Sequence, residues 1–290
     1  MKNKAFIKYI VSLLLFGFNG ICASQISLTS AEIVFLRTFI GSALLAVLFF
    51  VRNHKFTVSA SVRKDIVLII LSGIAMGVSW LFLYEAYQLI GVGLASLLYY
   101  CGPVIVMMLS PILFSEKFTL PKIIGFIAVL VGIFFVNGDL ADTDGNAWGL
   151  LCGMLSAVAF FLMVVLNKFA KRIKGLENSL IQLTVSFLTV AVYSITRQGF
   201  LVEIPAASWP WIITLGVVNT GIGCYLYFSS IGKLHVQTVA ACGYIEPLSA
   251  VIFASLLLGE KMTALQIVGA ILIIGGAMIG ELVKIKKPKA

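Results

Sequence analysis

Long apolar runs recur along almost the whole chain, and this feature limits its fold more than any other. Stretches of about 18 or more apolar residues are typical of transmembrane helices. We predict ten such spans, at residues 5–25, 31–51, 66–89, 93–114, 121–137, 147–168, 178–197, 209–232, 236–258 and 264–282. Charged residues make up only 11% of the chain, whereas soluble proteins carry about a quarter. The sequence therefore predicts an all-α integral membrane protein with ten transmembrane helices and no segment left for a soluble catalytic domain.

Basic residues fall mainly in alternate loops between the predicted spans. Of the 21 lysines and arginines, eighteen lie on the side of the N-terminus: Lys2, Lys4, Lys8, Arg52, Lys55, Arg63, Lys64, Lys117, Lys122, Lys168, Lys171, Arg172, Lys174, Lys233, Lys284, Lys286, Lys287 and Lys289. Arg197 and Lys261 lie on the other side, and Arg37 falls inside a span. Because cytoplasmic loops are enriched in basic residues, we expect a multi-pass protein of the cytoplasmic membrane with both termini in the cytoplasm. The net charge of +9 then indicates a lipid bilayer as partner, and no nucleic acid.

The cysteines and histidines show no pattern of catalytic or metal chemistry. The five cysteines fall inside predicted spans without a CxxC spacing, which is typical of packing residues. The two histidines, His54 and His235, lie in predicted loops, so a zinc site or a Ser-His-Asp hydrolase would lack its imidazole at membrane depth. We expect no enzyme activity, no catalytic residue, no metal and no cofactor.

A repeat with a period of 144 residues relates the two halves of the chain. A shift of this length, without a gap, superposes Tyr100 on Tyr244, Pro103 on Pro247, Glu116 on Glu260, Lys117 on Lys261, Thr119 on Thr263, Gly125 on Gly269 and Gly132 on Gly276. Self-similarity at a fixed period indicates tandem copies of one structural unit. We assign residues 1–138 to the first copy, 139–146 to an external linker, and 147–290 to the second copy with a basic cytoplasmic tail.

The number of spans in each copy predicts the architecture. Each copy contains five predicted spans, so the second copy enters the membrane from the opposite side. The chain is therefore predicted to consist of two inverted five-helix repeats. Inverted repeats are typical of secondary transporters, because two nearly equivalent halves allow two nearly equivalent states, one open inward and one open outward. Some channels share this architecture.

Several motifs also carry a family resemblance. They are the mid-span Pro103, the "EP" pair at 246–247, "SEKFT" and "GEKMT" closing the fourth span of each copy, the glycines Gly125 and Gly269, and Arg37 in "FLRTFIG". In these motifs the chain resembles the EamA-type ten-helix permeases of the drug/metabolite transporter superfamily, over roughly residues 7–282. The resemblance implies a basket-shaped bundle with a central cavity, lined mainly by the first, third and fourth helices of each half, that exports or otherwise passes small metabolites such as amino acids. The copies differ where Gly102 stands in place of Glu246.

Two prolines predict helix breaks near the middle of the membrane. Pro103 and Pro247 fall at the midpoints of their spans, and each frees a carbonyl one turn back, at Tyr99 and Gly243. An unpaired carbonyl is costly in hydrocarbon, so such a break persists where a neighbour, a water or a substrate satisfies it. The breaks are interpreted as part of a transport site or as kinks that shape packing, and the two interpretations are compatible.

Two ionisable residues are predicted at membrane depth. A charged carboxylate there costs at least about a few kcal/mol, so Glu246 is expected to face a cavity or a partner. Burial favours the neutral acid, which either couples to protons and substrate or forms a purely structural hydrogen bond. Arg37 either pairs with an acid or a substrate carboxylate, or extends to the outer interface.

Aromatic and amide side chains complete the candidate site. The cavity candidates are Asn19, Trp80, Tyr84, Tyr99, Tyr100, Asn219, Tyr225 and Tyr244. An aromatic wall with hydroxyl tips suits an amphipathic solute of amino-acid size, and helix packing is the alternative role. Tyr87 is assigned to an aromatic belt at the outer interface.

The function hypothesis is a secondary transporter that moves small metabolites by alternating access, with amino acids or related solutes and export expected. A membrane-embedded enzyme or flippase acting on lipid-linked substrates and a channel are the alternatives. The expected partners are a small-molecule substrate and the bilayer, and association into a homodimer is left open.

Overall fold

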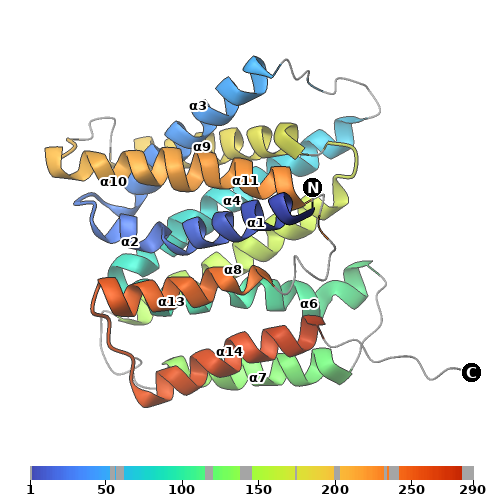
Figure 1. Ribbon diagram of the computed structural model, residues 1–290, viewed down its shortest axis with the longest axis vertical. Coiled ribbons are helices and arrows are strands. Elements are labelled where there is room, and N and C mark those ends of the chain that lie inside the picture. Colours follow the sequence, from blue (N-terminus) through green and yellow to red (C-terminus); the bar gives the residue numbers. More distant parts are fainter. Residues whose placement is uncertain are drawn as a thin grey trace, which may run out of the picture.

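All regular structure in the described part of the chain is helical (Figure 1). The computed structural model describes residues 2–52, 56, 62–114, 120–137, 146–173, 175–198, 203–231, 234 and 242–282. The helices are α1 (Lys2–Gly17), α2 (Asn19–Ser24), α3 (Ser30–Val51), α4 (Arg63–Ile90), α5 (Val92–Tyr99), α6 (Cys101–Phe114), α7 (Leu120–Asn137), α8 (Asn146–Phe169), α9 (Gly175–Gln198), the 3-10 helix η2 (Ala206–Ser208), α10 (Trp209–Ile213), the π-helix η3 (Thr214–Ile222), α11 (Gly223–Ile231), α13 (Ile245–Leu257) and α14 (Ala264–Leu282). The prediction of an all-helical fold is confirmed for these residues.

Four features discussed above lie outside the described residues. They are residues 139–145 of the predicted linker, the "SEKFT" motif at 115–119, the two histidines His54 and His235, and the basic tail at 283–290. The extent of the linker and the boundaries of the two copies therefore stay predictions.

Five helical segments in the described ranges are long and apolar enough to cross a membrane. They are Lys4–Ser24, Ser30–Val51, Arg63–Ile90, Ala147–Phe169 and Gly175–Thr196. Four shorter apolar helices are Val92–Val106, Ile123–Gly132, Ile245–Leu257 and Ala264–Gly276. Helix occurs within each of the ten ranges predicted as spans, but the number of spans stays a prediction.

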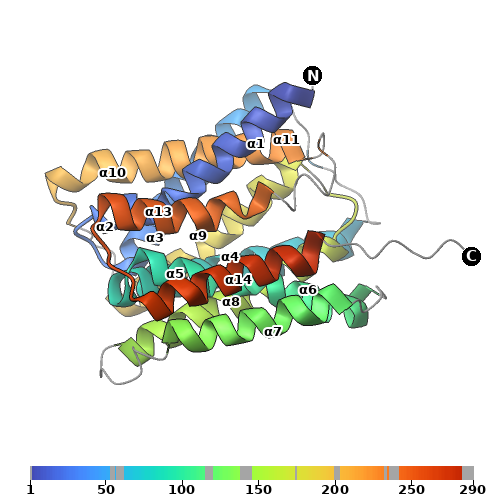
Figure 2. The same cartoon turned by 60° about the horizontal axis from the view of Figure 1, so that its bottom comes forward.

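The fifth predicted helix of each half packs against the other, and the two run antiparallel. These helices, α7 and α14, lie side by side (Figures 1 and 2). A Cβ atom on Gly132 would lie 2.7 Å from the carbonyl oxygen of Gly269, and one on Gly276 would lie 2.6 Å from that of Gly125. The 144-residue shift carries each of these two contacts into the other. The packing therefore fits a two-repeat architecture with a twofold relation between the halves.

The other helix contacts follow the same relation. The third helix of the first half, α4, packs on α8 and α9 of the second half, while α10, η3 and α11 pack on α1, α2 and α3 of the first. In the fourth position of each half, α5 packs against α13. Because each half places its third and fourth helices against the other half, the centre of the molecule is an interface between the halves.

The fourth helices break at equivalent residues. Tyr100 separates α5 from α6 with φ −74° and ψ 0°, and Tyr244 precedes α13 with φ −73° and ψ −7°. Pro103 and Pro247 are each the third residue of the helix that follows, where a missing N–H removes no intrahelical bond. Each proline thus lies in the first turn of a helix segment that follows the break.

Candidate functional site

A small cavity lies at the interface between the halves. Its volume is about 30 Å³, which is room for one or two water molecules and too little for an amino acid. Seven of the nominated residues line it: Asn19, Arg37, Trp80, Tyr84, Tyr99, Tyr100 and Glu246. They come from α2, α3, α4, α5, the α5–α6 break and α13. The fold therefore brings side chains that are more than 200 residues apart in sequence around one space.

Arg37 is held inside the bundle by hydroxyl groups and aromatic rings. Its side chain is 3% exposed, so it does not extend to the outer interface, and that alternative is wrong for this structure. Nε donates a hydrogen bond to Thr220 Oγ1 at 3.2 Å, and Nη1 donates one to the hydroxyl oxygen of Tyr84. The guanidinium carbon lies 4.4 Å from the ring centroid of Trp80 and 5.0 Å from that of Tyr84, distances at which cation–π attraction operates.

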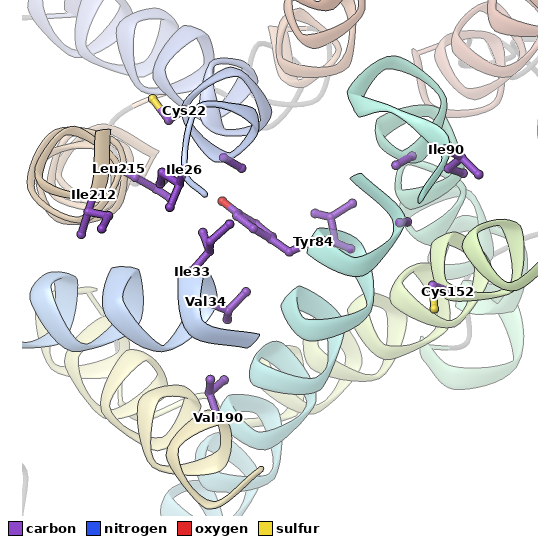
Figure 3. Close-up of a cluster of buried hydrophobic side chains, with 14 of the residues drawn as sticks. Cys22, Ile26, Ile33, Val34, Tyr84, Ile90, Cys152, Val190, Ile212 and Leu215 are labelled. Carbon is purple, nitrogen blue, oxygen red and sulfur yellow. The ribbon is translucent and has the colours of Figure 1, made fainter. Parts of the chain in front are cut away.

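The hydrogen-bond partners of the Arg37 guanidinium group are neutral side chains, and no carboxylate of the described residues forms an ion pair with it. Tyr84 extends from α4 toward Ile26 and Leu215 within a buried apolar cluster (Figure 3), so its ring is fixed by packing. Its hydroxyl and that of Thr220 are neutral. Buried charges are normally paired, so an arginine with these neutral partners is a candidate for binding an anionic group at the cavity.

Thr220 lies in an unusual helical segment that sequence analysis did not predict. Residues Thr214–Ile222 form a π-helix within the eighth predicted span, and π-helical turns are often found at functional sites. The hydroxyl of Thr220 accepts from Arg37 and donates to the carbonyl of Leu215 at 2.8 Å. The neighbouring Asn219 is buried and points elsewhere, donating to Cys22 Sγ at 3.7 Å. Arg37 thus contacts a segment whose backbone departs from the α-helical pattern.

Glu246 lies in the first turn of α13 and faces the cavity, where Tyr100 is a neighbour of its carboxyl group. The backbone beside it is crossed closely by α1: a Cβ atom on Gly17 would lie 2.9 Å from the carbonyl oxygen of Glu246. The hydroxyl of Ser249 donates to the same carbonyl at 2.8 Å. Because Gly17 has no side chain, α1 and α13 approach while the carboxyl side chain keeps its own space.

The crossing of α6 with α8 is equivalent to that of α13 with α1. Here the glycine at the contact, Gly102, lies on the fourth helix of its half, whereas Gly17 lies on the first. A Cβ atom on Gly102 would lie 2.7 Å from Cδ1 of Phe160 and 2.9 Å from the carbonyl oxygen of Ala157, both on α8. A side chain at position 102 would therefore press against α8, whereas the equivalent position carries Glu246, which lines the cavity. Close packing against α8 thus accounts for a glycine at position 102.

Polar atoms of the cavity wall are buried, and Asn19 Oδ1 has no hydrogen-bond partner in the described residues. The hydroxyls of Ser96 and Tyr100 are also buried there and have Tyr87 and Glu246 as polar neighbours. Buried polar side-chain atoms usually have a partner in the protein or in ordered water. Together with Arg37 and Glu246, these atoms leave the wall with hydrogen-bonding capacity for a polar ligand.

Five nominated residues lie outside the lining of this cavity. Tyr225 lies near the start of α11, where its hydroxyl accepts from Arg52 Nη2 at 2.6 Å and its ring centroid lies 5.7 Å from Lys8 Nζ. Tyr244 packs in a buried apolar cluster, and Asn219 faces α2. Pro103 and Pro247 follow the helix breaks and set the direction of the helices. Depth in the membrane placed these residues near the cavity, but the face of each helix could not be read from a nearly uniform apolar run.

Some lining residues were not nominated. They include Phe16, Gly17, Leu83, Ser96 and Ala250, which are small or apolar and show no signal in the sequence. Tyr87, which was assigned to an aromatic belt at the outer interface, also lines the cavity. Its ring centroid lies 5.1 Å from that of Tyr84, because residues three apart share a helix face.

Comparisons with known proteins agree with this architecture. The uncharacterized transporter YxxF of Bacillus subtilis (strain 168) is 22% identical over 278 residues, which cover 95% of this chain and 88% of that protein. A protein of Escherichia coli (strain K12) named a probable amino-acid metabolite efflux pump is 26% identical over 200 residues, covering 64% of this chain and 66% of that protein. One crystal structure shares the fold with a TM-score of 0.69 at 16% identity, covering 97% of this chain and 99% of that one.

The family comparison covers both copies of the repeat. The family model described as the EamA-like transporter family matches residues 3–138 and, separately, residues 147–280. The family and the names of these relatives indicate a membrane transporter rather than an enzyme. The chain belongs to the EamA-like transporter family.

Proposed function

We propose that this protein is a secondary transporter that exports amino acids or related small amphipathic solutes across the cytoplasmic membrane by alternating access. The observation that carries the proposal is the pairing of a buried Arg37, without a described carboxylate partner, with Glu246 in one cavity between the halves. A solute with both an anionic and a cationic group matches such a site.

The chemistry of the wall supports a zwitterionic solute. A guanidinium group binds a carboxylate through two parallel hydrogen bonds, and a substrate carboxylate at Arg37 would replace the neutral hydroxyls of Tyr84 and Thr220 as its partners. A substrate ammonium group is matched by Glu246 and by the face of an aromatic ring such as Tyr99. The buried oxygen Oδ1 of Asn19, which has no partner in the described residues, adds an acceptor for the same group.

The size of the cavity supports a cycle in which the halves move. A space of about 30 Å³ does not admit an amino acid, so the helices around it must separate for a solute to enter. The twofold relation between the halves allows the same movement on either side of the membrane. Ten spans, an inverted second copy and cytoplasmic termini belong to this proposal. The printed name of the Escherichia coli relative, a probable amino-acid metabolite efflux pump, supports the substrate class and the direction.

The test is counterflow in proteoliposomes that contain the purified protein. Vesicles loaded with one unlabelled amino acid at a time should accumulate the same labelled amino acid transiently, because a carrier exchanges solute faster than it empties. Arg37→Gln should abolish this signal, while Arg52→Gln, which removes an arginine that lies outside the cavity, should retain it.

Two outcomes contradict the proposal. Flux that neither saturates nor shows counterflow indicates a channel. A folded protein that moves no solute from a broad metabolite panel removes the transport hypothesis.

A further inference from the structure

The side chain of Glu260 joins the two halves at one end of the bundle. Glu260 follows α13, and its carboxylate accepts two hydrogen bonds from the start of α5: Val92 N to Oε1 at 2.7 Å and Gly93 N to Oε2 at 2.9 Å. The first N–H groups of a helix have no partner within the helix, and a negative charge there is favoured by the helix dipole. Glu260 thus fastens α5 of the first half to the end of α13 of the second.

Two glycines make this approach possible. Gly91, which precedes α5, has a φ of +82°, a conformation that other residues rarely adopt. A Cβ atom on Gly91 would lie 2.9 Å from Glu260 Oε1, and one on Gly93 would lie 3.0 Å from Oε2. A side chain at either position would displace the carboxylate, so the sequence Gly91-Val92-Gly93 is matched to it.

The fastened helices are those that form part of the cavity wall. Ser96 and Tyr99 belong to α5, and Glu246 and Ala250 belong to α13. The two helices pack against each other (Figure 2). In the predicted topology the segment that contains Glu260 faces the outside, so separation of α5 from α13 at this end would open the cavity outward.

We propose that Glu260 is a positioning residue that holds the outer end of the transport pathway closed. Outward opening breaks the hydrogen bonds from Val92 and Gly93, and the carboxylate re-forms them when the pathway closes. This inference rests on the proposed transport function. It assigns to Glu260 control of access to the site and no direct contact with the solute.

The test measures how fast a thiol in the cavity reacts from outside. Ser96→Cys places a thiol on the wall formed by α5, and a charged methanethiosulfonate reagent that does not cross the bilayer is added to intact cells without substrate. The chain without Ser96→Cys sets the background from the native cysteines. Glu260→Gln preserves the size of the side chain and removes its charge. We expect labelling to become about tenfold faster, because hydrogen bonds to charged groups are stronger than neutral ones.

Two further variants separate the inference from a general effect. Glu203→Gln removes an exposed acid on the same predicted side and should leave the rate unchanged. Gly93→Ala keeps the charge of Glu260 but places a methyl group against its carboxylate, while alanine itself favours helix. Gly93→Ala should therefore raise the outside labelling rate without lowering the thermal stability of the protein.

The direction of access decides the outcome. Inside-out vesicles expose the opposite face, and there Glu260→Gln should leave labelling unchanged or slower. An equal rise from both faces indicates loosened packing and overturns the inference, as does an unchanged outside rate for both Glu260→Gln and Gly93→Ala. If Ser96→Cys does not fold, Ala250→Cys provides a second thiol on the same cavity. Since no substrate is present, faster outside labelling in a protein that moves no solute would contradict the transport function and leave the closing contact intact.

Discussion

Gly276→Ala should destabilise the protein because it places a methyl group between α14 and the backbone of α7. The added Cβ atom would lie 2.6 Å from the carbonyl oxygen of Gly125, 2.8 Å from the Cβ of Ala128 and 3.2 Å from the backbone nitrogen of Val129. Two of these three atoms belong to the backbone, so a side-chain rotation cannot relieve the contact and the helices must separate. Overpacking of this kind costs about 1–3 kcal/mol.

The same substitution also has a favourable effect, which a substitution at a neighbouring glycine measures separately. Alanine is better than glycine in a helix interior by about 1 kcal/mol, so the net loss for Gly276→Ala is about 1 kcal/mol, within a range of about 0–2 kcal/mol. Gly275→Ala is the matched control, because a Cβ atom there has no heavy atom within 4 Å among the described residues. It should be neutral or slightly stabilising. Gly132→Ala makes the image of the Gly276 contact and should cost about as much as Gly276→Ala.

The assay is thermal unfolding of the purified protein in one detergent, followed by loss of the monodisperse peak in size-exclusion chromatography. The expected order of midpoints is Gly275→Ala at or above the parent chain, and Gly276→Ala and Gly132→Ala below it by a few degrees. Equal midpoints for Gly275→Ala and Gly276→Ala would refute the close contact of α7 and α14. A loss for Gly276→Ala without one for Gly132→Ala would refute the twofold relation of the two contacts.

Two further predictions concern the cavity, and a third concerns the packing of α6 against α8. Glu246→Gln should abolish transport driven by a pH gradient, since an amide does not release a proton, and should leave expression and exchange of solute intact. Equal pH-driven flux in the variant and the parent chain would contradict a role of Glu246 in proton coupling. Arg37→Lys should raise the substrate concentration needed for half-maximal counterflow by about tenfold or more. The reason is that a lysine ammonium group lacks the planar guanidinium fork that binds a carboxylate and stacks on Trp80. An unchanged concentration dependence would argue against a substrate carboxylate at Arg37. Gly102→Ala should lower the unfolding midpoint through its contact with the carbonyl of Ala157, at about 1–3 kcal/mol, and a neutral effect would show that α6 and α8 are farther apart.

The elements of the fold could be predicted because the requirements of the bilayer determine which residues a membrane-spanning helix contains and how they follow one another. A helix that crosses hydrocarbon must be long and apolar, so helices occur within the ranges that the apolar runs indicate. The repeat could be predicted because equivalent breaks need equivalent residues: Tyr100 and Tyr244 adopt nearly the same backbone angles and precede equivalent prolines. Seven of the nominated residues line one cavity because polar and aromatic groups at membrane depth are costly and tend to face an interior space.

Other features of the site could not be predicted because they depend on which helix face meets which neighbour. In a span with few polar residues the hydrophobic pattern has little amphipathic direction, so Tyr225 and Tyr244 could not be separated from Tyr99 and Tyr100. The π-helix at Thr214–Ile222 has no signature in its residue types.

The sequence by itself determined that this chain is a helical membrane protein made of two related halves, and that Arg37 and Glu246 are the ionisable groups to examine. Only the tertiary structure decided what they do there. It turned Arg37 inward onto Trp80, Tyr84 and Thr220, and it placed Glu246 in the wall of the cavity between the halves. The physical reason is that burial cost acts on each residue by its type, and is visible in the sequence, whereas partners and free space arise from close packing between segments far apart in the chain.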